Sequence, residues 1–178
     1  MMEEQDYMRR ALALAEEAAL DEETPIGCVI VRDGEIIGEG RNRRNTLGNP
    51  LAHAEMEAIN QASGVIGDWR LEDCTLYVTL EPCPMCAGAI VQARIKRVVI
   101  GAMNPKAGCA GSIFNLLIEP RFNHRCEVET GMLEEESRTI LQRFFGGLRK
   151  KAAEAKQKEA GLMKAENAPG CVISENMV

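Results

Sequence analysis

The sequence predicts an α/β domain in which helices pack on a sheet. Segments with apolar residues at helical spacing alternate along the chain with short segments rich in β-branched residues. A helix joins the strand expected at residues 75–80 to the one expected at 98–100, and a crossover of this kind links parallel strands. No repeat and no linker divides the chain. We therefore expect one domain over residues 1–158, followed by a flexible tail over 159–178.

Helical spacing and a hairpin signal define the first half of the chain. Pro25 separates the first helix from a short, β-branched segment that is typical of a buried strand. Asp33-Gly34 then stands between two apolar segments, which is the strongest short signal for a β-hairpin. A polar loop over residues 42–50 leads to His53, where a second helix should begin and then end near Gly64. The expected elements are a helix over about residues 6–20, strands over 26–31 and 36–37, and a helix over 53–63.

The second half continues the alternation of strands and helices. Glu81-Pro82 ends the third strand, because proline cannot donate a hydrogen bond within a sheet. The last helix has an apolar face that includes Ile140, Leu141 and Leu148. The expected elements are a strand over 75–80, a helix over 83–95, a strand over 98–100, a short helix over 113–118, a weak strand over 127–129 and a helix from 134 to about 158.

Composition indicates a soluble, cytoplasmic protein. Hydrophobic residues make up 46% of the 178 residues and charged residues 27%, which is ordinary for a globular domain. No apolar segment approaches the roughly 18 residues that a membrane span requires, and the acidic N-terminus lacks a signal-peptide pattern. Seven cysteines with irregular spacing argue against a disulfide framework.

The net charge of −6 conceals a basic segment near the end of the chain. Residues 138–158 contain seven basic side chains and one acidic one, Glu154. Such a segment can be an electrostatic contact for a nucleic acid. It can equally be a solvated helix end whose cations suit the helix dipole. Composition alone leaves both interpretations open.

A histidine, a glutamate and two cysteines form the most specific motif in the sequence. His53 and Glu55 are followed about thirty residues later by Cys83 and Cys86. Two thiolates at this spacing and one imidazole can bind a zinc ion, and three protein ligands leave the fourth position of a catalytic site for water. Glu55 is then available as a proton acceptor. Because residues two apart on a helix point about 200° apart, His53 and Glu55 can share a site only in an irregular first turn.

Each half of the motif has a simpler interpretation when it is taken alone. An isolated Cys-x-x-Cys pair is as often structural as catalytic, and an isolated histidine is usually an ordinary core or surface residue. A closed four-cysteine site could use Cys109 or Cys126, although these lie in no second close pair. The combination of His-x-Glu with Pro-Cys-x-x-Cys is far more specific and is the signature of zinc nucleobase deaminases.

With these residues the chain resembles the tRNA adenosine deaminases of the cytidine-deaminase-like superfamily. The resemblance extends over about residues 7–151. The zinc motif is common to the superfamily, whereas the other matching segments point to the tRNA enzymes. The segments are Pro25-Ile26-Gly27, Ala52–Glu55, Leu76–Ala89, Asn123-His124 and Phe144-Phe145.

The resemblance implies a three-layer α/β/α fold with a central mixed five-stranded sheet, and a homodimer. It also implies conversion of adenosine to inosine at the wobble position of a tRNA anticodon stem-loop, with one Zn²⁺ ion per chain. His53, Cys83 and Cys86 match the metal ligands. Glu55 matches the proton shuttle of a reaction in which hydroxide adds to C6 of adenine and protonation then releases ammonia.

Seven further residues match positions that contact the target nucleoside or the surrounding RNA: Asn42, Ala54, Asn104, Lys106, Asn123, Phe145 and Arg149. Asn42 could also be an ordinary turn residue, and Phe145 could pack in the core. Position 104 is often Asp in this family, and Asn lacks an acceptor-only carboxylate. We therefore expect Asn104 to weaken the discrimination between ribose and deoxyribose.

Two other functions fit the same zinc motif. A free-base or nucleoside deaminase acting on guanine, cytosine or cytidine would use the same core, so only contacts around the pocket separate it from a tRNA enzyme. A zinc-stabilised binding module without turnover would leave Glu55 and the open fourth position unexplained. The sequence indicates no membrane partner.

Overall fold

The computed structural model describes residues 3–166 of the chain, with side chains through residue 158. Contacts within the chain define two compact units, Met1–Phe144 and Phe145–Val178. One domain over residues 1–158 stays a prediction, and so does the flexible tail, whose residues 167–178 lie outside the described part. None of the described helices has the length and apolarity needed to cross a bilayer.

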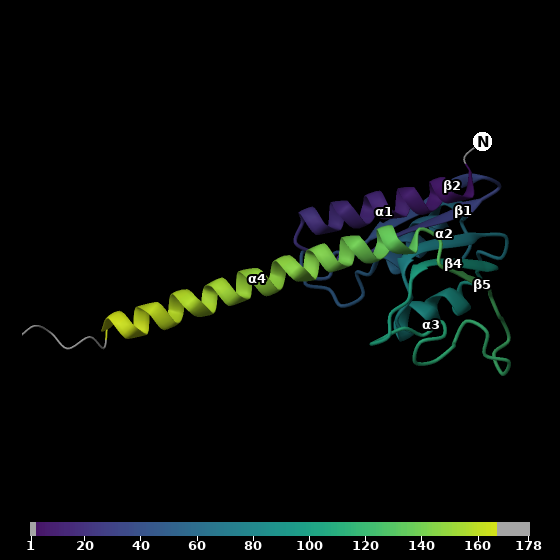
Figure 1. Cartoon of the computed structure of the whole chain (residues 1–178). Helices are drawn as coiled ribbons and strands as arrows, with labels where there is room; N and C mark the ends of the chain where they lie inside the picture. Colours follow the sequence, from purple (N-terminus) through teal and green to yellow (C-terminus); the bar gives the residue numbers. More distant parts are fainter. Residues whose placement is uncertain (1–2, 167–178) are drawn as a thin grey trace, which may run out of the picture. The chain divides into compact units, whose positions relative to one another are not determined.

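A mixed five-stranded sheet forms the centre of the first unit (Figure 1). The strands lie in the order β2-β1-β3-β4-β5. β1 pairs antiparallel with β2 and β3, whereas β4 pairs parallel with β3 and β5. The mixed sheet and the parallel crossover from β3 to β4 are therefore confirmed. The bounds are β1 (Gly27–Arg32), β2 (Glu35–Arg41), β3 (Thr75–Leu80), β4 (Arg97–Ala102) and β5 (Glu127–Thr130).

Helices cover both faces of the sheet and give the predicted three-layer α/β/α arrangement. They are α1 (Glu4–Leu20), α2 (Ala54–Ile66), α3 (Pro84–Gln92) and α4 (Glu134–Glu166). Successive strand residues point to opposite faces. Leu76 and Val98 pack in one core with α2 and α3. Tyr77 and Val99 pack in another with α1 and with Ile140 of α4. Figure 1 shows α1 and α3 on opposite sides of the sheet.

Two glycines allow α2 to lie directly against β2. A Cβ atom at Gly38 would overlap the carbonyl oxygen of Ala58, and one at Gly40 would overlap that of Ala54. Each position therefore requires a residue without a side chain, because backbone atoms cannot be displaced as a flexible side chain can. Ala54 is the first residue of α2. The contact at Gly40 thus fixes how closely the start of this helix approaches the sheet.

Two helices extend beyond the C-terminal ends that their sequence patterns predict. α2 continues through Gly64 to Ile66 and ends at Gly67, which adopts the left-handed conformation with φ 72°. This is the usual geometry of a glycine that terminates a helix. α4 runs to Glu166, eight residues beyond the predicted end. The alanines, lysines and glutamates after residue 151 are good helix formers, which explains the extension.

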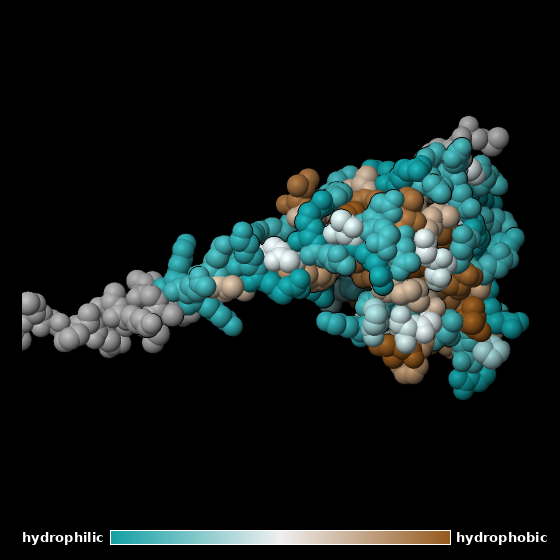
Figure 2. All heavy atoms as spheres, viewed as in Figure 1, coloured by the Kyte–Doolittle hydropathy of each residue, from teal (hydrophilic) through white to brown (hydrophobic). Residues whose placement is uncertain are grey.

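The short helix predicted over residues 113–118 is absent from the structure. The segment is instead held by an isolated bridge between Ala110 and Asn115 and by a backbone hydrogen bond from Leu116 to Cys109. Its apolar residues do not form a buried helical face, because Leu117 is buried while Phe114 is exposed. Figure 2 shows separate hydrophobic patches of this kind on a mostly hydrophilic surface of the first unit.

Candidate metal centre

The metal-binding side chains lie where two helices begin. His53 is the N-cap residue of α2, with extended dihedral angles of φ −91° and ψ 153°, and Glu55 follows in the first turn. Cys83 is the N-cap residue of α3, with φ −72° and ψ 173°, and Cys86 lies in the first turn after Pro84. An extended N-cap is the irregular first turn that the spacing of His53 and Glu55 requires. β3 leads into Cys83, so the site lies at the carboxyl end of a parallel strand, where α/β sheets place their ligands.

The distances between the ligand atoms fit a single metal ion. His53 Nδ1 lies 3.6 Å from Cys86 Sγ and 3.8 Å from Cys83 Sγ. With Zn–N and Zn–S bonds of about 2.0 and 2.3 Å, nitrogen and sulfur ligands of a tetrahedral zinc ion stand about 3.5 Å apart. Within the described part of the chain, the group of potential metal ligands comprises these three residues and includes neither Cys109 nor Cys126. A closed four-cysteine site is therefore not formed there.

The two thiols of the site differ in acidity. A hydrogen bond from Cys86 lowers the pKa of Cys83 to about 4, and nearby His53 acts in the same direction. The same hydrogen bond and burial raise the pKa of Cys86. The bond to Cys83 also raises the pKa of His53. Cys83 is thus the first thiol to ionise, and a thiolate beside an imidazole is the form in which these residues bind metal ions.

Glu55 is a buried carboxyl group with one unsatisfied oxygen. Its side chain is 3% exposed, and Oε2 has no hydrogen-bond partner in the described structure. Burial raises the pKa of Glu55 to about 6, and the neighbouring Cys83 adds to the effect. Leaving a buried acceptor unpaired costs free energy, so such atoms are uncommon and often functional. An unpaired carboxylate oxygen beside three metal-binding side chains can transfer protons.

Glu81 is a second buried carboxylate near the ligands, and sequence reasoning assigned it no role. Its Oε2 accepts hydrogen bonds from the Asn104 N–H group, at 2.8 Å, and from the Ser112 hydroxyl group. Its Oε1 accepts the N–H groups of Ala110, at 2.9 Å, and Ser112, at 3.0 Å. Glu81 therefore ties the loop after β4 to the end of β3, two residues before Cys83. Its donors lie 23 to 31 residues away, which is why no local pattern marks it.

Asn42 lies beside the start of α2. It is 4% exposed, and its backbone N–H group donates to the carbonyl of Ile26 at 3.1 Å. The next residue, Arg43, donates to the carbonyl of Ala52 at 2.9 Å, directly before His53. The Asn42 side chain donates through Nδ2 to Oε2 of Glu23 at 3.2 Å. Glu23 is fully buried, and no pattern in the sequence distinguished it.

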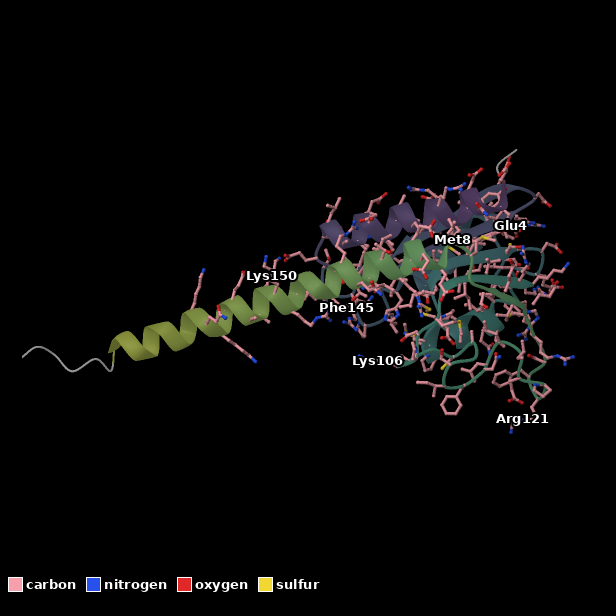
Figure 3. The ribbon with its side chains drawn as sticks, viewed as in Figure 1. Glu4, Met8, Lys106, Arg121, Phe145 and Lys150 are labelled. Atoms are coloured by element: carbon pink, nitrogen blue, oxygen red, sulfur yellow. The ribbon has the colours of Figure 1, made fainter. Side chains whose placement is uncertain are left out.

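The other substrate residues predicted in the first unit lie in different surroundings. Ala54 is fully buried in the core, so only its backbone could meet a ligand. Asn104 is half-buried, and its Oδ1 accepts the N–H group of Lys106 at 3.3 Å. Lys106 itself is exposed on this loop (Figure 3). Asn123 is exposed next to His124, whose Nε2 donates to the carbonyl of Ile95 at 2.8 Å.

Phe145 and Arg149 belong to the second unit. Both side chains are exposed on α4, and Phe145 and the nearby Lys150 are labelled in Figure 3. Exposure of Phe145 shows that it is not fully buried in a core. Contacts of these two residues with RNA stay predictions.

Comparison with known proteins connects this geometry to deaminases. The MafB19-like deaminase family matches residues 2–149. A tRNA-specific adenosine deaminase of Bacillus subtilis is 51% identical over 157 residues, which is 88% of this chain and 98% of that protein. A tRNA-specific adenosine deaminase of Streptococcus pyogenes is also 51% identical, over 89% of this chain and 94% of its own length.

Solved structures of deaminases with two different substrates are similar to this chain. A structure from studies of A-to-I editing by tRNA:A34 deaminases at the wobble position of transfer RNA superimposes with a TM-score of 0.74. It is 43% identical over 76% of this chain and 99% of its own chain. A guanine deaminase from Bacillus subtilis is 47% identical over 57% of this chain and 66% of its own, with a TM-score of 0.56.

Proposed function

The chain belongs to the family of tRNA-specific adenosine deaminases, and we propose that it hydrolytically deaminates adenosine to inosine at the wobble position of a tRNA anticodon. The observation that carries this proposal is the unpaired Oε2 of Glu55 beside His53, Cys83 and Cys86. A structural metal site has no use for a buried carboxylate oxygen that lacks a donor. Hydrolytic deamination does require one, because a proton must move from water to the leaving amine.

His53, Cys83 and Cys86 would hold one zinc ion per chain. A set of one imidazole and two thiolates favours zinc over hard cations such as Mg²⁺. When bound with an open fourth position, zinc acts as a Lewis acid that makes water more acidic. The protein supplies the remaining chemistry through side chains around this position.

Glu55 is the group that moves the proton. Its Oε2 accepts a proton from the attacking water, and the resulting hydroxide adds to C6 of adenine. The carboxyl group returns this proton to N1 of the ring and then carries the proton of the new C6 hydroxyl group to the 6-amino group. The C6–N6 bond breaks as the C6 carbonyl forms, and ammonia leaves. One water is consumed and one ammonia released for each inosine formed. Burial removes the water that would stabilise the Glu55 carboxylate and raises its pKa to about 6. A pKa near neutral suits a group that must both take and return a proton.

The seven residues that match substrate positions would bind the anticodon loop. Among these residues, Asn42 and Ala54 are the nearest in sequence to a metal ligand, His53. We assign the Asn42 side chain and the Ala54 backbone to the target nucleoside. Exposed Lys106 is suited to a phosphate contact. Asn123, Phe145 and Arg149 are assigned to flanking nucleotides. An anticodon loop already presents its bases unstacked, which lowers the cost of inserting one into a pocket. A tRNA substrate implies a cytoplasmic enzyme, and the family resemblance implies a homodimer.

Asn104 would relax the selectivity for ribose. Its Oδ1 already accepts the N–H group of Lys106, so the group that remains for a ligand is the amide NH₂, a donor. An aspartate could keep this turn with one oxygen and still offer the other to a 2′-hydroxyl group. Wild type should therefore edit single-stranded DNA better than Asn104→Asp, and equal or lower editing of DNA by wild type would refute this assignment.

A free purine base is the second candidate substrate, because a guanine deaminase of known structure shares 47% identity with part of this chain. The test incubates zinc-loaded protein with an anticodon stem-loop that carries adenosine at the wobble position. Parallel samples contain adenosine, guanine, cytosine or cytidine, and products are read by mass spectrometry. Inosine in the stem-loop alone supports the proposal. Deamination of a free base or nucleoside rejects the tRNA substrate, and zinc-loaded protein without any product indicates a binding module.

A further inference from the structure

Glu23 is a fully buried carboxylate in the connection between α1 and β1. Its Oε1 accepts two hydrogen bonds from Thr46, one from the backbone N–H group at 2.6 Å and one from the hydroxyl group at 2.9 Å. Its Oε2 accepts the side-chain Nδ2 of Asn42 at 3.2 Å. Every group that faces Glu23 in these contacts is a donor. An ionised carboxylate, which only accepts hydrogen bonds, therefore matches this environment.

The contact with Glu23 determines which end of the Asn42 amide is available to a ligand. Nδ2 points to Glu23, and Oδ1 accepts no hydrogen bond from the described residues. Oxygens that are both buried and without a partner include Glu55 Oε2 and Asn115 Oδ1, but not Asn42 Oδ1. Because Asn42 Oδ1 also has no partner in the described part of the chain, it must retain access to solvent. Rotating the amide by half a turn would place Oδ1 against the carboxylate, which is repulsive. Oδ1 is thus fixed as the accessible end.

The loop that carries Asn42 is attached to the metal centre. Arg43 donates its backbone N–H group to Ala52, which directly precedes His53. The contact of Gly40 with Ala54 brings the end of β2 against the first residue of α2. These two contacts place Asn42 beside the segment that leads into α2, directly before His53 and Glu55 in the sequence.

We propose that Glu23 is a positioning residue that fixes the amide of Asn42 so that its oxygen, and not its nitrogen, meets a hydrogen-bond donor of the nucleoside. The inference rests on the proposed function, since it assigns the orientation of a residue in that site. In an RNA strand the donors of adenosine are the 2′-hydroxyl and 6-amino groups, and either pairs with an acceptor. Glu23 selects between an acceptor and a donor at one position without touching the substrate.

The substitution Glu23→Gln should invert Asn42 without breaking the network. The Gln oxygen is expected to face the two donors of Thr46, which leaves its NH₂ group facing Asn42. Asn42 then satisfies this donor with Oδ1 and presents NH₂ to the substrate. The internal hydrogen bonds are conserved, so the melting temperature and the zinc content should stay close to wild type. kcat/KM on the stem-loop should fall by about 10-fold to 100-fold, because a donor now faces a donor.

The double variant Glu23→Gln with Asn42→Asp provides the decisive rescue. One oxygen of the carboxylate introduced at position 42 accepts the NH₂ group of the new glutamine, and the other is again an acceptor for the nucleoside. kcat/KM should recover to within about fivefold of wild type, whereas Asn42→Asp alone places two carboxylates against each other and stays impaired. Glu39→Gln is the matched control, because this partly buried glutamate of β2 pairs with Arg10 of α1 and makes no hydrogen bond with Asn42.

The outcomes separate the two proposals. A wild-type protein that makes no inosine in the stem-loop refutes the proposed function. Active wild type with unchanged kcat/KM in Glu23→Gln refutes the positioning role. The same follows if the loss in Glu23→Gln persists in full in the double variant, or if it is equally large in an Asn42→Ala background, where no amide remains to be oriented.

Discussion

Two buried glutamates stand near the metal ligands, and their surroundings give them opposite properties. Glu55, in the first turn of α2, is 3% exposed, and Glu81, at the end of β3, is 2% exposed. Glu55 has an oxygen without a partner, and burial raises its pKa to about 6. Burial also acts to raise the pKa of Glu81, but hydrogen bonds from Ser112, Asn104 and Ala110 outweigh it, so the pKa is lowered.

The comparison teaches that neither burial nor nearness to the ligands makes a carboxylate reactive. Both residues lie two positions from a ligand in the sequence, Glu55 after His53 and Glu81 before Cys83. The difference lies in the donors. A carboxylate that accepts four hydrogen bonds is held as an anion and stabilises a loop, whereas one with an unpaired oxygen can exchange a proton. The same substitution at the two positions should therefore have different effects.

The largest effect is expected from Glu55→Gln on catalysis. The amide has the shape of the carboxyl group but cannot shuttle a proton, so the turnover rate on the stem-loop should fall by about 10²-fold to 10⁴-fold. The variant should keep its zinc and its melting temperature, because Oε2 makes no hydrogen bond and an amide oxygen can still accept the hydrogen bond of Cys86. Metal analysis and single-turnover kinetics check both statements. Substantial residual turnover would remove Glu55 from the proposed mechanism.

Glu81→Gln should instead lower stability. One of the N–H groups of Asn104, Ala110 or Ser112 would then face the NH₂ group of glutamine and lose its acceptor. We expect the free energy of unfolding to decrease by about 2–3 kcal/mol, as for a buried donor left without its partner. Urea denaturation measures this, with Glu55→Gln as the matched control. Equal stability of the two variants would contradict the structural assignment of Glu81.

Gly108→Ala tests the same loop from the other side of the contact. A Cβ atom at Gly108 would overlap the carboxylate of Glu81. The overlap should cost about 1–3 kcal/mol of unfolding free energy, because the carboxylate is held by four hydrogen bonds and cannot withdraw freely. Gly88 in α3 offers a control, since a Cβ atom there meets nothing within 4 Å. Gly88→Ala should be neutral or stabilising by up to about 1 kcal/mol.

The smallest effect is expected at a partly exposed glutamate, Glu4, which pairs with Arg97. The hydrogen bond from Arg97 lowers the pKa of Glu4. A lowered pKa means that the pair stabilises the folded chain above the ordinary carboxylate pKa and loses this contribution as the pH falls through the lowered value. Glu4→Gln should cost less than about 1 kcal/mol at pH 7 and less still as the pH falls through the lowered pKa of Glu4, measured against wild type. A larger loss at the acidic pH would reverse the assigned sign.

Features specified by neighbouring residues could be predicted from the sequence. The strands, the starts of the helices and the zinc motif all depend on short spacings, and the structure brings His53, Cys83 and Cys86 together as their pattern indicates. The structure also gives His53 the extended N-cap conformation that its spacing from Glu55 requires. Each half of the motif follows from geometry within one or two turns of the chain, whereas the two halves lie about thirty residues apart and meet through the fold.

Features that depend on distant donors could not be predicted. Glu23 acquires its role from Asn42 and Thr46, 19 and 23 residues away, and Glu81 from a loop more than twenty residues later. The segment over residues 113–118 was predicted as a helix from its apolar residues, but its backbone pairs with the preceding loop instead. For Glu23 and Glu81 the deciding partner lies outside the range over which a sequence pattern carries information.

The close approach of α2 to β2 has a consequence for how the protein can vary. Gly38 and Gly40 supply neither a metal ligand nor a group assigned to the substrate, yet a methyl group at either one would push against the backbone of α2. Since His53 and Glu55 move with that helix while Cys83 and Cys86 belong to another, the displacement would change the spacing between the two halves of the centre. In a library of random variants, these two positions should therefore be as intolerant as the ligands themselves.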